Sequence, residues 1–311
     1  MDCAKYSIKQ LEKYLETIEV DEKVISNLQK DPRKGVRDLA KKYRRLIELE
    51  RVKVERWHLL NKKEAFLRKN GFELIAGVDE AGRGPLAGPV VAAAVILDPA
   101  ETLLGLDDSK NLTVEERERL FALISQQALA VGTGIVDNHT IDQLNILQAT
   151  FEAMRKAVRS LVPLPEYLLI DGNCKIPHCS LKQETVIDGD RKVNAIAAAS
   201  IVAKVTRDRL LEEYHQQYPQ YGLIRNKGYG TKEHIEALKQ YGPSSLHRFT
   251  FSIVNKYNYI KTKNQILQTD QPKELIQLGE TLAASSIFTA ENLVELRKVY
   301  RKQFKKISKG G

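Results

Sequence analysis

Short apolar runs that end in acidic residues are the feature of this sequence that most restricts its fold. Three such runs, bounded by Gly, Pro and Asp, lie in the middle of the chain: ELIAGVDE (73–80), PEYLLIDG (165–172) and QETVIDGD (183–190). This pattern predicts strands, which would end at Asp79 and Glu80, at Asp171, and at Asp188 and Asp190. Buried carboxylates are costly unless they are paired or bind a metal. The acids therefore indicate a function rather than a contribution to folding.

Two more apolar runs, PVVAAAVIL (89–97) and LAVGTGIVD (129–137), predict strands that form a meander with the strand at 73–80. Helical periodicity predicts further elements between and after the strands, at 113–127, 141–161, 193–217 and 231–240. Strands and helices mixed in this order predict an α/β fold, in which helices pack on a sheet.

Both ends of the chain read as helical extensions. Residues 1–70 show helical spacing of apolar positions and end at a plausible stop, Asn70-Gly71. The stretch 291–308, ENLVELRKVYRKQFKKIS, predicts a basic amphipathic helix, and we expect a flexible linker before it at about 257–275. The predicted division is an N-terminal extension (1–70), a catalytic domain (71–256) and a C-terminal extension (257–311).

The net charge of +9 is unevenly distributed. Residues 1–70 hold 19 Lys/Arg against 12 Asp/Glu, residues 71–256 hold 20 against 23, and residues 257–311 hold 10 against 5. Basic ends are typical of solvated helices, and equally of segments that attract a polyanion. The charge alone does not separate the two readings.

The remaining composition indicates a cytoplasmic globular protein. No run approaches the roughly 18 apolar residues of a membrane span, and the N-terminus, MDCAKYSIKQ, has no apolar signal core. Three cysteines, an odd number in a long chain, argue against a disulfide framework.

If the acid-ended strands are neighbours, their carboxylates meet at one edge of the sheet. Like charges crowded there repel each other unless a cation lies among them, and an all-oxygen set suits Mg²⁺ or Mn²⁺. Two such ions are a usual device for hydrolysing a phosphodiester. Adjacent strand residues point to opposite faces, so Asp79 and Glu80 require either a bulge or a metal contact through the Glu80 carbonyl. Strand-terminal aspartates also commonly cap turns, but three strands together favour the metal.

The glycine turn that follows, AGRGPLAG (81–88), fits neither common nucleotide motif. It lacks the lysine of a Walker A loop, and Ala87 stands where a dinucleotide fingerprint needs glycine. Gly82 and Gly84 more plausibly let the backbone approach a ligand closely, with Arg83 facing phosphate.

Four segments together resemble type 2 ribonuclease H, the bacterial ribonuclease HII family. They are DEAGRGPLAGP, LLIDG, GDRKVNAIAAASIVAKVTRD and NKGYGTKEH, in the family's order, and the resemblance covers about 72–255. It implies the ribonuclease H fold, a mixed five-stranded sheet flanked by helices. It also implies hydrolysis of RNA in RNA–DNA hybrids and incision 5′ to single ribonucleotides in duplex DNA, leaving 5′-phosphate and 3′-hydroxyl ends. That activity serves DNA replication and ribonucleotide excision repair.

The resemblance also assigns residues. The metal-binding catalytic acids would be Asp79, Glu80, Asp171 and Asp190; the family pattern favours Asp190, in the Gly-Asp pair, over Asp188. The substrate-binding set would be Gly82, Arg83 and Gly84, which read the ribose 2′-hydroxyl through the backbone, Tyr229 packing on the sugar, and the contacts Ser109, Lys110, Lys204 and Lys227. Lys204 would meet a phosphate or pair with Asp208. For His247 and Arg248 we expect a structural role.

Several alternatives stay open at this point. A type 3 ribonuclease H shares the core but carries an N-terminal sheet domain, and a non-catalytic hybrid-binding protein is a third reading. We expect a monomer that binds RNA–DNA hybrid and ribonucleotide-containing duplex and no membrane; a sliding-clamp contact is left open. The C-terminal helix could bind duplex backbone, pack on the N-terminal arm or hold another protein. If it binds duplex, removing 257–311 should leave cleavage intact and weaken binding at moderate salt.

Overall fold

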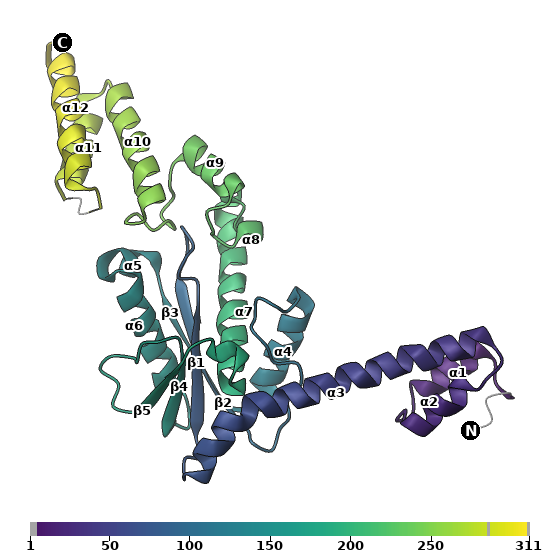
Figure 1. The fold of residues 1–311 in the computed structure, drawn as a ribbon. Coiled ribbons are helices and arrows are strands. Elements are labelled where there is room, and N and C mark those ends of the chain that lie inside the picture. Colours follow the sequence, from purple (N-terminus) through teal and green to yellow (C-terminus); the bar gives the residue numbers. More distant parts are fainter. Residues whose placement is uncertain (1–4, 285–286, 310–311) are drawn as a thin grey trace. The chain divides into compact units, whose positions relative to one another are not determined.

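The structure is a computed structural model, and it describes residues 5–284 and 287–309. Its centre is a five-stranded sheet with strand order β3-β2-β1-β4-β5 (Figure 1). The strands are β1 (Ile75–Ala81), β2 (Val90–Leu97), β3 (Ala128–Val136), β4 (Tyr167–Asp171) and β5 (Lys182–Val186). The first three pair antiparallel, whereas β4 runs parallel to β1 and β5 parallel to β4. The predicted mixed sheet and its meander are confirmed.

Helices cover both faces of this sheet. Those that pack on the strands are α4 (Val114–Gln127), α6 (Ile146–Arg159) and α7 (Asn194–Gln217). The others pack mainly on neighbouring helices: α5 (Asn138–Leu144) on α6, α8 (Leu223–Asn226) on α7, and α9 (Lys232–Tyr241) on the 3₁₀ helix η3 (Pro219–Tyr221). Ala76 and Val78 of β1 share a buried cluster with Ala153 and Ala157 of α6. Because side chains alternate along a strand, the residue between them, Gly77, faces the other side.

That other side of β1 packs very closely against α7. A Cβ on Gly77 would lie 2.1 Å from the carbonyl carbon of Ala195 in α7, so only glycine fits there. The alanine-rich start of α7, which is buried from Asn194 to Ala203, allows this approach. The close packing fixes the long helix directly behind the strand that carries Asp79 and Glu80.

The N-terminal segment forms a separate compact unit. Its helices are α1 (Ile8–Leu15), α2 (Glu22–Gln29) and α3 (Lys34–Lys69), and Leu11, Ile25 and Val36 lie in one buried cluster. One compact unit comprises Met1–Lys62 with Thr102–Gly105, and the other comprises Lys63–Glu101 with Leu106–Gly311. Helix α3 therefore runs across the division, near the boundary predicted at residue 70.

The C-terminal segment departs from the prediction. It contains α10 (Ser252–Gln268), α11 (Pro272–Ala284) and α12 (Ala290–Lys309), so the flexible linker expected at 257–275 is wrong. Ile266 and Leu275 are fully buried in a cluster shared by the three helices. This non-local packing orders a stretch whose own sequence is polar. The basic amphipathic helix itself is confirmed as α12.

Among the described residues, no helix is long and apolar enough to cross a membrane.

Candidate active site

The predicted acids gather around one cavity of about 380 Å³. Asp79 and Glu80 come from the end of β1, Asp171 from the end of β4, and Asp190 from the short 3₁₀ helix η2 (Gly189–Arg191) after β5. Since β1, β4 and β5 are parallel neighbours, their carboxyl ends share an edge. The cavity lining is Asp79, Glu80, Ala81, Gly82, Arg83, Gly84, Ser109, Lys110, Asp171, Asp190, Ser200, Lys204, Arg207 and Tyr229.

The two adjacent acids of β1 reach this cavity without a bulge in the pairing with β2, which is regular through Ala81. Asp79 is 5% exposed, and its Oδ1 accepts the Glu80 N–H at 2.7 Å. The Glu80 carboxylate lies 3.3 Å from the Arg83 guanidinium. Of the two alternatives expected, the bulge is therefore absent, and a metal contact through the Glu80 carbonyl stays a prediction. The strand's end places both side chains near Asp171.

Burial and the charges of neighbouring acids make Asp79, Glu80 and Asp190 harder to ionise. The pKa of Asp79 lies well above its usual value because of burial and then the charges of Glu80 and Asp171. Burial, with Asp171 adding to it, also raises the pKa of Glu80 despite Arg83. The pKa of Asp190 rises to about 6 through burial and the charges of Asp108 and Asp171. A cation bound among the acids would relieve this repulsion.

The donor set suits a hard divalent cation. All four acids offer oxygen, and no cysteine or histidine lines the cavity, which is the chemistry that Mg²⁺ and Mn²⁺ prefer. In the described part of the chain, no three His, Cys, Asp or Glu side chains are close enough together to hold a metal ion as they stand. The four carboxylates instead line an open cavity of about 380 Å³.

The glycine turn after β1 is held by two buried arginines that the sequence reasoning did not assign to the site. Arg248 donates to the carbonyls of Gly82 (2.6 Å) and Arg83 (2.9 Å). Arg207 donates to the carbonyls of Pro89 (3.0 Å) and Lys227 (2.9 Å). Gly82 has φ +96°, and a Cβ there would lie 2.1 Å from the Arg207 Nε. The turn therefore needs glycine to fit over a guanidinium.

This arrangement frees two backbone donors. In a trans peptide the C=O and the following N–H point in opposite directions, so the N–H groups of Arg83 and Gly84 face away from the Arg248 guanidinium. No described residue accepts a hydrogen bond from either group. Both residues line the cavity, which leaves the two N–H groups for a ligand.

Tyr229 lies across the same cavity and is 47% exposed. Its carbonyl is bonded by His234 Nδ1 at 3.0 Å, and His234 Nε2 is 3.0 Å from His247 Nε2. The Ser244 N–H donates to His247 Nδ1 at 3.0 Å. That bond fixes the tautomers, because His247 must then donate from Nε2 and His234 from Nδ1. His247 thus acts structurally, as predicted, by holding the tyrosine loop.

The predicted lysines and serine fall into different positions. Lys110 and Lys204 line the cavity, and Lys204 also pairs with Asp208 at 2.7 Å. Ser109 lines it too, and its hydroxyl lies 3.0 Å from that of Ser200. Lys227 is not in the lining, because its Nζ pairs with Glu212 at 3.0 Å.

Asp108 is a further residue that the sequence reasoning passed over. It is 1% exposed and pairs with Arg191 at 2.9 Å. Burial opposes its ionisation, but the Lys110 N–H and the Arg191 guanidinium outweigh this and lower its pKa. Its negative charge contributes to the raised pKa of Asp190. Its only signal in the sequence was its place beside Ser109 and Lys110.

The mixed sheet and the acid-lined cavity at its edge define a nuclease with a ribonuclease H-like fold. Two family models match this chain: Ribonuclease HII over residues 76–254 and Ribonuclease HII N-terminal domain over residues 7–68. The chain belongs to the ribonuclease HII family. It is thus a ribonuclease H endonuclease, and the type 2 interpretation is confirmed.

Curated relatives and solved structures agree with this assignment. Ribonuclease HII of Bacillus subtilis (strain 168) is 45% identical over 252 residues, covering 81% of this chain and 98% of the relative. The Geobacillus thermodenitrificans (strain NG80-2) enzyme is 48% identical over 253 residues, covering 81% and 97%. The crystal structure of ribonuclease H2 from Pyrococcus horikoshii OT3 has a TM-score of 0.52 at 29% identity, covering 59% of this chain and 96% of that one. The PCNA:RNase HII complex from Archaeoglobus fulgidus has a TM-score of 0.51 at 28% identity, covering 58% and 95%.

Proposed function

We propose that this enzyme hydrolyses the RNA strand of RNA–DNA hybrids and also incises duplex DNA on the 5′ side of a single embedded ribonucleotide. Its products carry 5′-phosphate and 3′-hydroxyl ends. The observation that carries the proposal is one cavity lined by four carboxylates, by two free backbone N–H groups and by an exposed tyrosine. The acids supply the chemistry, and the turn with the tyrosine supplies the recognition of one sugar.

Recognition at a single nucleotide depends on the ribose 2′-hydroxyl, which is what distinguishes RNA from DNA. The Arg83 and Gly84 N–H groups can donate to that oxygen, while the Tyr229 ring packs on the sugar. A Cβ on Gly84 would come within 3.6 Å of the Tyr229 ring, so the turn and the tyrosine flank the same space. A sugar held there would lie beside the carboxylates that line the same cavity.

The carboxylates Asp79, Glu80, Asp171 and Asp190 would hold two Mg²⁺ or Mn²⁺ ions. When bound, such ions activate water and stabilise the charge that develops on the phosphate. Lys204 and Lys110, in the same lining, would neutralise neighbouring phosphates. A contact with a sliding clamp stays a prediction; the archaeal relative, solved as a complex with PCNA, is its support.

Incubation with a duplex that contains one ribonucleotide, with and without divalent metal, tests the proposal. We expect incision on the 5′ side of the ribonucleotide only with metal. Asp79→Asn should reduce the rate by at least about 100-fold, since even changes next to metal ligands cost about 10–100-fold, and it should still bind the duplex. Cleavage confined to longer RNA tracts would favour a type 3 specificity, and binding without any turnover would favour the non-catalytic reading.

A further inference from the structure

The family models match the chain up to residue 254, so α11, α12 and all but the first residues of α10 lie beyond the matched range. They nevertheless share a hydrophobic cluster of their own. Its fully buried members include Ile266 from α10, Leu275 from α11 and Leu296 from α12. An ordered addition of this kind requires a function that the comparisons do not assign.

Helix α12 has two distinct faces. Its apolar residues, among them Leu296, Val299 and Ile307, pack into the cluster. The other face carries exposed cations in two adjacent rows, with successive cations of each row four residues apart. This cationic stripe consists of Arg297, Lys298, Arg301, Lys302, Lys305 and Lys306.

None of the six cations forms an ion pair with any residue that the structure describes. Exposed cations elsewhere commonly do, as in the pairs of Arg209 with Glu118 and of Lys239 with Glu236. Like charges four residues apart destabilise a helix. The stripe therefore costs stability and is not explained by folding.

We propose that this stripe binds the phosphate backbone of duplex nucleic acid, as a second contact outside the catalytic cavity. The stripe spans nine residue steps, about 14 Å of helix, and a B-form duplex presents about eight phosphate charges over that axial length. The proposal rests on the proposed function only for the choice of nucleic acid as the polyanion. Contacts of this kind carry no base sequence information.

Docking of an apolar partner, or insertion into a lipid surface, is less compatible with the structure. The apolar residues Leu296, Val299 and Ile307 of α12 already pack against α10 and α11, so that face is not available. What α12 leaves exposed includes the six cations, with Val294 and Phe304 as its exposed large apolar residues.

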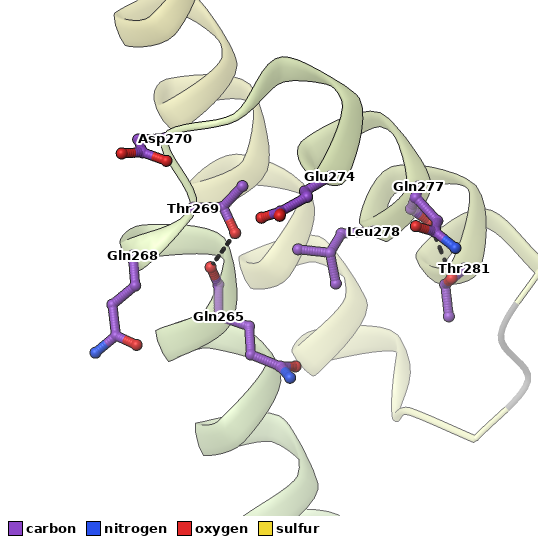
Figure 2. A pocket seen from close by; sticks show the side chains of 8 residues that line it. All are labelled: Gln265, Gln268, Thr269, Asp270, Glu274, Gln277, Leu278 and Thr281. Carbon is purple, nitrogen blue, oxygen red and sulfur yellow. Dashed lines mark hydrogen bonds between the residues drawn. The ribbon is translucent and has the colours of Figure 1, made fainter.

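A cavity elsewhere in these helices provides a control. Figure 2 shows its lining, to which α10 and α11 contribute Gln265, Gln268, Gln277 and Glu274. The three glutamines are exposed, and the cavity has no cationic residue in its lining. Changing them to Glu alters the net charge without touching the stripe.

The test compares two full-length variants, each with a net charge lower by three, one through loss of three cations and the other through gain of three anions. One is Arg301→Gln/Lys302→Gln/Lys305→Gln, and the control is Gln265→Glu/Gln268→Glu/Gln277→Glu. Binding to an all-DNA duplex is measured by fluorescence anisotropy in chelator over a range of salt. We expect the stripe variant to lower the slope of log K against log salt by about two to three, at about 0.9 per lost phosphate contact. Its affinity at about 0.1 M salt should fall about tenfold or more, with the control close to wild type.

Equal losses in both variants would show an effect of net charge only and overturn the proposal, as would an unchanged slope in the stripe variant. Anionic phosphatidylserine vesicles bound by the wild type and not by the stripe variant, with duplex affinity unchanged, would assign the surface to a membrane instead. Incision of the single-ribonucleotide duplex at saturating substrate should be unaffected by the stripe variant. If the wild type fails to incise, the proposed function fails, while the salt-slope comparison still decides the stripe.

Discussion

Arg248 shows how one buried residue can determine what a turn recognises. It is 0% exposed and donates only to backbone carbonyls, including those of Gly82, Arg83 and Gly88. Burial and then the nearby Arg207 lower its pKa to about 9. Burying a cation without a carboxylate partner costs free energy of folding. In this position, however, Arg248 fixes the turn, so that the N–H groups of Arg83 and Gly84 are oriented before a substrate binds.

Replacing Arg248 by Lys keeps the charge but removes the planar fork. We expect kcat/KM on a single-ribonucleotide duplex to fall by about 10–100-fold, since displacing a reacting group by about 1 Å can cost about 100-fold. Mn²⁺ affinity, measured by calorimetric titration, should be unchanged, because the carboxylates are not touched. Arg225→Lys, at an exposed pair with Glu233, should match wild type in both assays. Loss of metal binding together with activity would indicate general misfolding rather than a positioning role.

The His234–His247 pair makes the tyrosine loop sensitive to acid. Burial, and then the neighbouring His234, lower the pKa of His247 to about 3, and burial lowers that of His234. In the unfolded chain His247 takes up a proton near pH 6.5, whereas in the folded chain it stays neutral to a lower pH. The stability contributed by neutral His247 is therefore present above about pH 6.5 and is lost as the pH falls toward about 3.

We expect the midpoint temperature of thermal unfolding of the metal-free protein to decrease as the pH is lowered below about 6.5. Asp190 acts in the opposite direction over about pH 4–6, since its raised pKa favours the protonated folded form. The comparison with His247→Gln isolates the histidine. That variant should start less stable at pH 8 and lose less between pH 6.5 and 4. Parallel curves for the two proteins would show that the pair does not titrate with folding.

At the scale of elements, the sequence predicted those features, such as strand ends and helix starts, that depend only on residues close together in the chain. The strand ends that carry Asp79 and Asp171 could be located because apolar runs and terminal acids lie within a few residues of each other. The third predicted strand ends earlier than expected, at Val186, and Asp190 lies in the 3₁₀ helix that follows it. The helix predicted at 113–127 is confirmed as α4, and its start is equally local, since Thr113 and Glu116 form a capping box there.

What the sequence did not reveal depends on distant partners. Arg248 lies more than 150 residues from the turn that it holds, and nothing near it in the sequence indicates that contact. The 257–268 stretch was expected to be a linker because its own sequence is polar. It is helical because it packs against α11 and α12, which lie later in the chain. Lys227 was expected to contact the substrate because it lies close to Tyr229 in the sequence. The ion pair that it forms with Glu212 of α7 could not be inferred from the sequence around it.

At the scale of the whole molecule, the chain combines two compact units, one containing Met1–Lys62 and the other most of the remainder. The four candidate catalytic carboxylates all belong to the larger unit, whereas the only tryptophan, Trp57, belongs to the smaller one. Trp57 fluorescence therefore reports on the smaller unit, whereas far-UV circular dichroism reports on the helices of both units, of which the larger unit holds the greater number.

Divalent metal should stabilise the larger unit selectively. A ligand at about 100 times its Kd adds about 2.7 kcal/mol to the free energy of unfolding, which corresponds to about 5–10 °C for a unit of this size. Relief of the repulsion that raises the pKa of Asp79 and Asp190 provides the driving force. We expect Mg²⁺ or Mn²⁺ to raise the dichroism transition and to leave the Trp57 fluorescence transition in place. Asp190→Asn should remove the metal response, and a single transition that moves in both signals would show that the units unfold as one.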